Sequence, residues 1–258
     1  MRICSVTGKK KRLNIESLID DFAVRSFRDS GDADYVMARA AFRCRLIPQA
    51  LWASLQAVEK YLKCILLLQR IKGKNIRHSL RRAIDILYGS NKVSLRLTPA
   101  SEEFIRHVDN YGRHRYFEIS IFSFGGETVD LDRVVWELRR YCAIDGYGFI
   151  ENKGKESGMH RVILEDIKLR EGSIPQKYYL PNGLLEKVID DEKHPAREIL
   201  LWQNGFFGKK QRRKVRLRRR FYAANAPLFL HPELLDEVVK YVYLPKDVVG
   251  AYREMRTK

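Results

Sequence analysis

Residues 50–69 read ALWASLQAVEKYLKCILLLQ, the most regular apolar pattern in the chain. Its inward positions are spaced alternately by four and three residues: Leu51, Leu55, Val58, Leu62, Ile65 and then Gln69. This is the period of a helix that buries one stripe against neighbouring helices. The pattern therefore predicts a long helix inside a helical bundle.

Four more helices are predicted around this one. Residues 32–45 carry helical spacing and must end before Pro48, because the residue preceding a proline avoids helical angles. Residues 77–87 and 130–142 show similar spacing, and Thr98-Pro99 is a start signal for a helix that runs to Tyr111 or Gly112. Five helices with short connections predict a mainly α fold that begins with an antiparallel bundle.

A chain of 258 residues is long enough for two domains of ordinary size. Residues 151–158, ENKGKESG, contain no apolar side chain and read as a linker. We expect a basic extension with a first helical segment at 1–29, the bundle at 30–150, and a smaller, basic, mixed α+β domain at 159–258. Within that last domain, 161–169 and 176–180 resemble strands, whereas 195–204, 232–242 and 246–255 have helical spacing.

The formal charge of +17 is concentrated in two short stretches, 9–12 and 209–220. The second carries nine basic residues and no acid: Lys209, Lys210, Arg212, Arg213, Lys214, Arg216, Arg218, Arg219 and Arg220. Such a field attracts polyanions and gains affinity by releasing counterions from phosphates. RNA is therefore the first partner to consider, although a solvated surface or a patch that faces an acidic protein or lipid has the same composition.

Aromatic residues flank this basic run: Trp202, Phe206 and Phe207 on one side, Phe221 and Tyr222 on the other. Arginines that alternate with aromatics can hold phosphates and stack on bases together. If the run forms a strand, Arg216, Arg218 and Arg220 share one face.

The cysteines, Cys4, Cys44, Cys64 and Cys142, show neither paired spacing nor the intervals to histidine that zinc sites use. They indicate a reducing compartment, and no metal or other cofactor is predicted. The sequence also lacks an apolar run of membrane-spanning length and an apolar signal-peptide core. We therefore expect a cytoplasmic protein.

Three motifs resemble those of the HEPN family. They are Asp34-Tyr35-x3-Arg39, the Gln56-Ala57-x-Glu59-Lys60-x-Leu62-Lys63 segment of the long helix, and His78-Ser79-Leu80. The resemblance covers roughly residues 30–145 and leaves the C-terminal half without a family. It implies a bundle of four or five helices that usually forms a homodimer.

Many HEPN proteins are metal-independent endoribonucleases with an Arg-x4-6-His motif on a late helix. The corresponding place here is 106–116, where seven residues separate Arg106 from His114, so the spacing departs from the motif. The resemblance implies a phosphate-holding cation and a histidine acid or base, with Arg106, Asn110 and His114 as catalytic candidates and Arg113 and Arg115 as RNA contacts. A helix that continues through Gly112 would place the three candidates on one face, whereas a helix that ends there would scatter them.

Several functions remain open at this point. Residues 111–116, YGRHRY, also resemble HEPN relatives that bind RNA or nucleotides without cutting, so the chain is expected to bind RNA with or without cleaving it, in a toxin or phage-defence role. An alternative is a non-catalytic dimerisation or interaction module that docks on a protein partner such as an antitoxin. A weaker hypothesis is a nucleotide site on the polar face of the long helix, which consists of Gln56, Glu59, Lys60 and Lys63. An ordinary ion pair between Glu59 and Lys63 would account for the same face.

Overall fold

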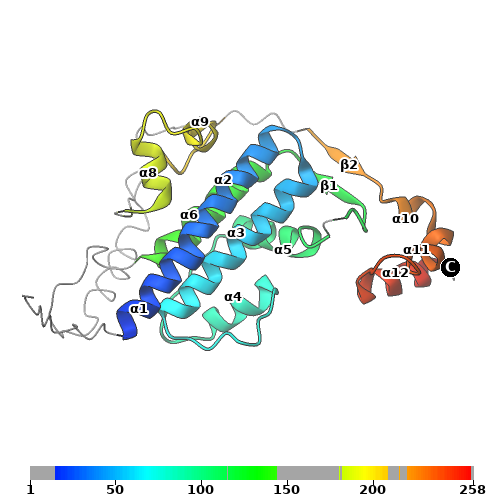
Figure 1. Ribbon diagram of the computed structural model, residues 1–258, viewed down its shortest axis with the longest axis horizontal. Helices are drawn as coiled ribbons and strands as arrows, with labels where there is room; N and C mark the ends of the chain where they lie inside the picture. The colour runs from blue at the N-terminus through cyan, green and yellow to red at the C-terminus, as the bar shows by residue number, and fades with distance from the viewer. Residues whose placement is uncertain are drawn as a thin grey trace, which may run out of the picture.

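The computed structural model describes residues 15–114, 116–143, 180, 182–208, 215 and 220–256. It confirms a mainly helical fold with packed N-terminal helices and a small antiparallel sheet (Figure 1). The elements of the bundle are α1 (Ile15–Phe22), the π-helical turn η1 (Ala23–Arg28), α2 (Asp29–Arg43), α3 (Ile47–Leu68), α4 (Leu80–Tyr88), α5 (Pro99–Tyr111), α6 (Glu127–Arg139) and the 3-10 turn η2 (Arg140–Cys142). The remaining elements are β1 (Ile121–Ser123), α8 (Leu184–Asp190), α9 (Arg197–Leu201), β2 (Tyr222–Ala224), α10 (Pro227–Leu230), η4 (Pro232–Leu234), α11 (Leu235–Val238) and α12 (Lys246–Arg256).

α3 is the central helix of the bundle, and its predicted apolar stripe is confirmed. Every apolar member of the stripe is at most 4% exposed: Leu51, Leu55, Val58, Leu62 and Ile65. α3 contacts α1, α2, α4, α5 and α6, so it is covered from several sides. This explains why residues 50–69 carry the strongest helical signal in the sequence.

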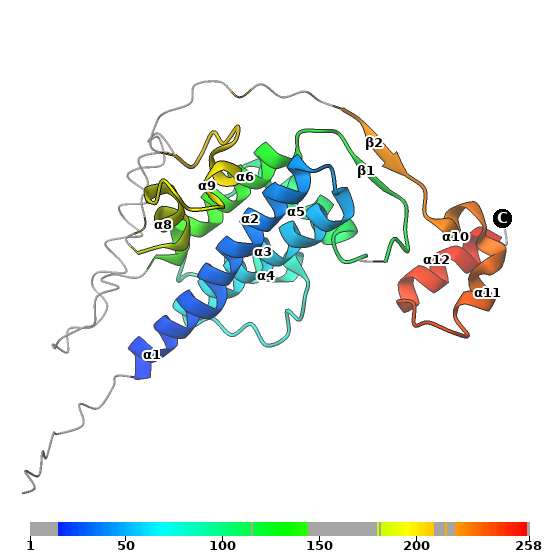
Figure 2. The same ribbon diagram turned by 45° about the horizontal axis from the view of Figure 1, so that its top comes forward.

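α1, η1 and α2 form one continuous helical rod that lies beside α3 (Figures 1 and 2). The rod begins at Ile15, so the helical segment expected within 1–29 continues without a break into the helix expected at 32–45. It ends in a tight turn in which Arg45 adopts a φ of 61°, and α3 then starts with Pro48 in its first turn. The short turn reverses the chain, so α2 and α3 pack as an antiparallel hairpin.

Hydroxyl caps start the next two helices. Ser79 Oγ accepts a hydrogen bond from Arg82 N at 3.4 Å, and Thr98 Oγ1 accepts one from Ser101 N at 3.3 Å. α4 and α6 are shifted by a few residues from the predicted ranges, and η2 extends α6 to Cys142. The predicted helices at 77–87, 98–111 and 130–142 are thus confirmed with shifted boundaries.

The core of the bundle continues into residues 184–207. Leu185, Val188, Leu200 and Phe207 belong to the same buried cluster as the side chains of α3. The first of two buried polar networks centres on Arg139, which donates two hydrogen bonds to Asp32 and two to Glu186, at 2.7–2.8 Å. α8 is therefore anchored on α2 and α6 through charge as well as through apolar packing.

Arg39 centres the second network, which holds α9 and the loop after it. Its guanidinium pairs with Asp132 of α6 and donates to the carbonyl oxygens of Ile199 and Trp202. Tyr35 donates to Asp132 at 2.7 Å and accepts a hydrogen bond from Asn204 at 2.9 Å. Both Tyr35 and Arg39, quoted above as parts of a motif, are thus buried structural residues.

The strands β1 and β2 pair antiparallel, with Phe122 opposite Ala223. Beyond this ribbon, α10, η4, α11 and α12 gather at one end of the molecule, away from α8 and α9 (Figure 2). They form a C-terminal module, residues 227–256, with its own small core of Leu228, Leu235, Val248 and Tyr252. Tyr252 Oη donates to Glu118 O at 2.7 Å, which ties the module to the loop after α5.

Some predicted features lie outside the described residues: the linker at 151–158, the strand at 161–169 and nearly all of that at 176–180. Leu180 is described and is not part of a strand. The helical spacing at 195–204, 232–242 and 246–255 corresponds to α9, to η4 with α11, and to α12. Among the described helices, none is both long enough and apolar enough to cross a bilayer.

Candidate functional site

The three predicted catalytic residues are divided by the end of α5. Arg106 and Asn110 lie one helical turn apart, and both are exposed. α5 ends at Tyr111, so His114 lies in the turn beyond it, where it is 9% exposed. Within the described structure no hydrogen bond or ion pair joins His114 to Arg106. The outcome is the one expected if the helix ends at Gly112.

Gly112, the first residue after this end, lies close to α3. A Cβ atom on Gly112 would lie 2.7 Å from the carbonyl oxygens of Leu51 and Val108 and 2.9 Å from Leu55 Cβ. These distances are shorter than van der Waals contact, so only glycine fits without a shift of the backbone. The packing of this turn on the central helix therefore requires glycine at residue 112, in the middle of the candidate motif.

The imidazole of His114 is held neutral by its surroundings. Burial lowers its pKa below the ordinary value, and the carboxylates of Glu118 and of Asp247 on α12 only partly oppose this. Its Nδ1 atom is buried without a hydrogen-bond partner in the described structure. A buried neutral histidine can serve as a base only where a substrate reaches it.

Of the two predicted RNA contacts beside it, Arg113 is already engaged. Its guanidinium donates to the carbonyl oxygen of Asp109 and to the carboxylate of Asp109, both at 2.7 Å. Arg115 lies outside the described residues. Arg106 has no such partner among the described residues, so it is the more available cation of α5.

Most of the basic run lies outside the described residues: Lys209, Lys210, Arg212, Arg213, Lys214, Arg216, Arg218 and Arg219. Arg220 is described, is exposed, and directly precedes Phe221 and strand β2. β1 contacts the C-terminal end of α5 through the rings of Phe122 and Tyr111. Pairing of β2 with β1 therefore holds Arg220, the last residue of the basic run, on the side of the molecule where α5 ends.

The polar face of α3 is occupied by ion pairs. Glu59 is paired with Lys63 at 2.5 Å and with His78 Nδ1 at 3.0 Å, and Lys60 is paired with Asp34 of α2 at 2.5 Å. The i,i+4 pair between Glu59 and Lys63 was expected as the ordinary interpretation of this face. Gln56 is half-buried. Paired side chains of this kind leave few groups available for a nucleotide.

A feature that the sequence did not reveal is a row of ring side chains between α5 and the ribbon. We call it the ring row: His107, Tyr111, Phe122, Phe124 and Phe221. Neighbouring ring centroids in it are 4.9–5.9 Å apart. Phe221 was singled out as a flank of the basic run, but its contact with Phe124 depends on strand pairing across about a hundred residues, which no local pattern reveals.

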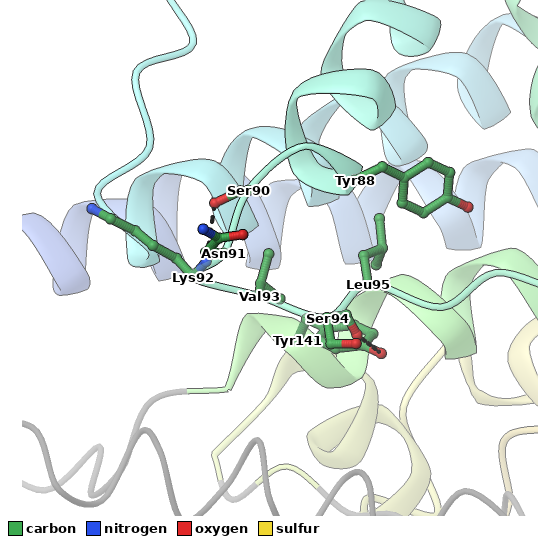
Figure 3. A pocket seen from close by; sticks show the side chains of 8 residues that line it. All are labelled: Tyr88, Ser90, Asn91, Lys92, Val93, Ser94, Leu95 and Tyr141. Carbon is green, nitrogen blue, oxygen red and sulfur yellow. Dashed lines mark hydrogen bonds between the residues drawn. The ribbon is translucent and has the colours of Figure 1, made fainter.

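A hollow of about 320 Å³ lies elsewhere, between the loop after α4 and Tyr141 (Figure 3). Tyr141 Oη donates to Ser94 O at 3.1 Å, and Lys92 Nζ donates to Arg70 O at 3.2 Å, so polar groups around it already have partners. None of the predicted site residues lines it. In the described part of the chain, no group of three or more histidine, cysteine, aspartate or glutamate side chains is placed to hold a metal ion.

Comparisons with models of protein families, with curated proteins and with solved structures find no match to this chain. The HEPN resemblance therefore stays a prediction that rests on the motifs quoted above.

Proposed function

We propose that this chain is a HEPN-like, cytoplasmic RNA-binding protein that acts as a homodimer in a toxin or phage-defence role. One observation carries the RNA-binding proposal. Arg220, the last of a run of nine basic residues, is exposed and directly precedes Phe221 and β2. The ring of Phe221 is exposed too and lies beside the exposed ring of Phe124. Clustered cations with adjacent exposed rings match the phosphates and bases of RNA.

Binding is better supported than cleavage in the described conformation. The cation of Arg106 is exposed, whereas the imidazole of His114 is buried and uncharged at neutral pH. A metal-independent nuclease needs an acid or base that touches the scissile phosphate. We therefore propose that RNA is bound without being cut while His114 stays covered.

The test measures the affinity for a labelled RNA by fluorescence anisotropy at several salt concentrations. We expect the affinity to fall steeply as salt rises, and the variant Arg216→Gln, Arg218→Gln, Arg219→Gln to show a slope of log K against log salt that is smaller by up to about three. As a matched control, Lys240→Gln, Arg253→Gln and Arg256→Gln remove three charges from the C-terminal module and should leave the slope nearly unchanged. Undetectable binding, or binding that ignores salt, would overturn the proposal.

Cleavage is tested on the same protein by incubation with mixed RNA in EDTA. We expect the RNA to remain intact with the wild-type chain. Metal-independent cutting that disappears in both Arg106→Ala and His114→Ala would instead assign a nuclease site to these residues.

A second candidate function, an interaction module, is favoured by the exposed apolar side chains of the C-terminal module. They are Phe229, Leu230, Leu234, Tyr241, Val242, Tyr243 and Met255. Exposed apolar side chains that gather into one patch are typical of protein contacts. If it joins two copies of the chain, Tyr241→Ser with Tyr243→Ser should turn a dimer into a monomer in sedimentation velocity, while the affinity for RNA per chain stays the same.

A further inference from the structure

The outer end of the ring row is open to solvent. Phe124 is 62% exposed and Phe221 is 68% exposed, and their ring centroids are 5.9 Å apart. Phe122, which meets Phe124 edge-to-face with ring centroids 5.2 Å apart, is half-buried. The row thus runs from half-buried rings on α5 to two adjacent phenyl rings that face water.

The backbone around these two rings is fixed. Phe124 N donates to Glu127 Oε1 at 2.5 Å, and Gly126 N donates to Glu127 Oε2 at 2.8 Å. Glu127 is itself buried at the start of α6, while Phe221 immediately precedes β2. The pair therefore stands on hydrogen-bonded elements, and binding a planar ligand against it would require little ordering of the backbone.

The charge beside the rings indicates which ligand they suit. Arg220 is exposed and adjacent to Phe221, and eight further basic residues precede it within 209–219. An apolar partner protein would gain nothing from this positive charge, whereas a nucleobase always has a phosphate close to it. Phenyl rings stack on any base, but only on a base that is not already paired and stacked within a duplex.

We propose that Phe124 and Phe221 form a stacking site for unpaired bases, so that the chain selects single-stranded RNA over duplex RNA. This inference rests on the proposed function, since it specifies which RNA the basic surface binds. A phosphate of the bound strand lies against Arg220, and because the two rings are tilted by 45° to one another, each ring stacks on a base of its own.

The experiment compares a labelled single strand with a duplex of the same sequence at one salt concentration. The variant Phe124→Leu with Phe221→Leu keeps apolar bulk and removes both rings. We expect its affinity for the single strand to fall about ten-fold or more and its affinity for the duplex to stay nearly constant. Phe22→Leu makes the same substitution at an exposed phenylalanine of α1, which belongs to no proposed binding surface, and should change neither affinity.

A second variant guards against misfolding. Phe124→Tyr with Phe221→Tyr retains both rings and should retain the preference for the single strand. Equal affinity of the wild-type chain for both forms, or wild-type affinity in the leucine variant, would overturn the stacking site while leaving RNA binding in place. An absence of salt-dependent binding to either form would instead overturn the proposed function itself.

Discussion

At Gly112, a side chain of one hydrogen atom allows α5 to pack against α3. Because a methyl group there would meet two carbonyl oxygens at 2.7 Å, we expect Gly112→Ala to destabilise α5 by roughly 1–3 kcal/mol. Gly250, in α12, would have nothing within 4 Å of an added Cβ methyl group, so Gly250→Ala should stabilise that helix by about 0.5–1 kcal/mol. Hydrogen exchange measured by mass spectrometry should show faster exchange in α5 of Gly112→Ala and slower exchange in α12 of Gly250→Ala. A change in the same direction in both variants would contradict the packing argument.

His107, in the ring row, should make the stability of the fold depend on pH. Burial lowers its pKa below the ordinary 6.5, and the carboxylates of Glu127 and Glu103 only partly oppose this. The unfolded chain therefore takes up the proton first, so the stability contributed by the neutral imidazole is complete above about pH 6.5 and is lost as pH falls below it. We expect His107→Phe, which keeps a stacking ring, to flatten the decline in unfolding midpoint between about pH 6.5 and 5. An unchanged decline in urea titrations would rule His107 out as its source.

At the scale of elements, α8 is anchored by the guanidinium of Arg139, which pairs with Asp32 of α2 and with Glu186 of α8. Burial alone would lower the pKa of Arg139, but Asp32 and Glu186 raise it well above the ordinary value, so it stays charged. Removing the charge of Glu186 leaves Arg139 paired with Asp32, so the opposite charges still cancel. Removing Arg139 leaves the carboxylates of Asp32 and Glu186 buried without their cation. We expect Arg139→Met to cost about 3–5 kcal/mol and Glu186→Gln roughly 1–3 kcal/mol in urea unfolding. A larger loss of stability in Glu186→Gln than in Arg139→Met would contradict this argument.

The sequence predicted the elements that depend on local patterns and missed the contacts that depend on residues far apart in the chain. α3 was predictable because its inward positions repeat with the period of a helix, and the start of α5 was predictable because the Thr98 cap is a local signal. The anchoring of α8 and α9 was not, because it depends on Arg39 and Arg139 meeting partners far along the chain. At the candidate site, the sequence offered a helix that continues through Gly112 or one that ends there, and the structure shows that α5 ends at Tyr111.

At the scale of the whole molecule, the bundle and the C-terminal module differ greatly in the size of their cores. The module buries four apolar side chains of its own and is tied to the loop after α5 by Tyr252. Small cores open at lower free energy than large ones. We therefore expect amides of 227–256 to exchange faster than those of α3, and Tyr252→Phe to speed only the former. Equal acceleration in α3 would mean that the molecule unfolds as one unit.

The opening of this module bears directly on His114. Its imidazole is covered in the described conformation, and Asp247 of α12 is among the charges that act on it. If the module covers it, Tyr252→Phe should increase the labelling of His114 by diethylpyrocarbonate several-fold, in parallel with the faster exchange of α12. His78, whose side chain is 84% exposed on another part of the bundle, should react equally in both proteins and serves as the control. Unchanged labelling of His114 despite faster exchange would mean that the loop after α5 covers the imidazole by itself, so that opening of the module does not expose it.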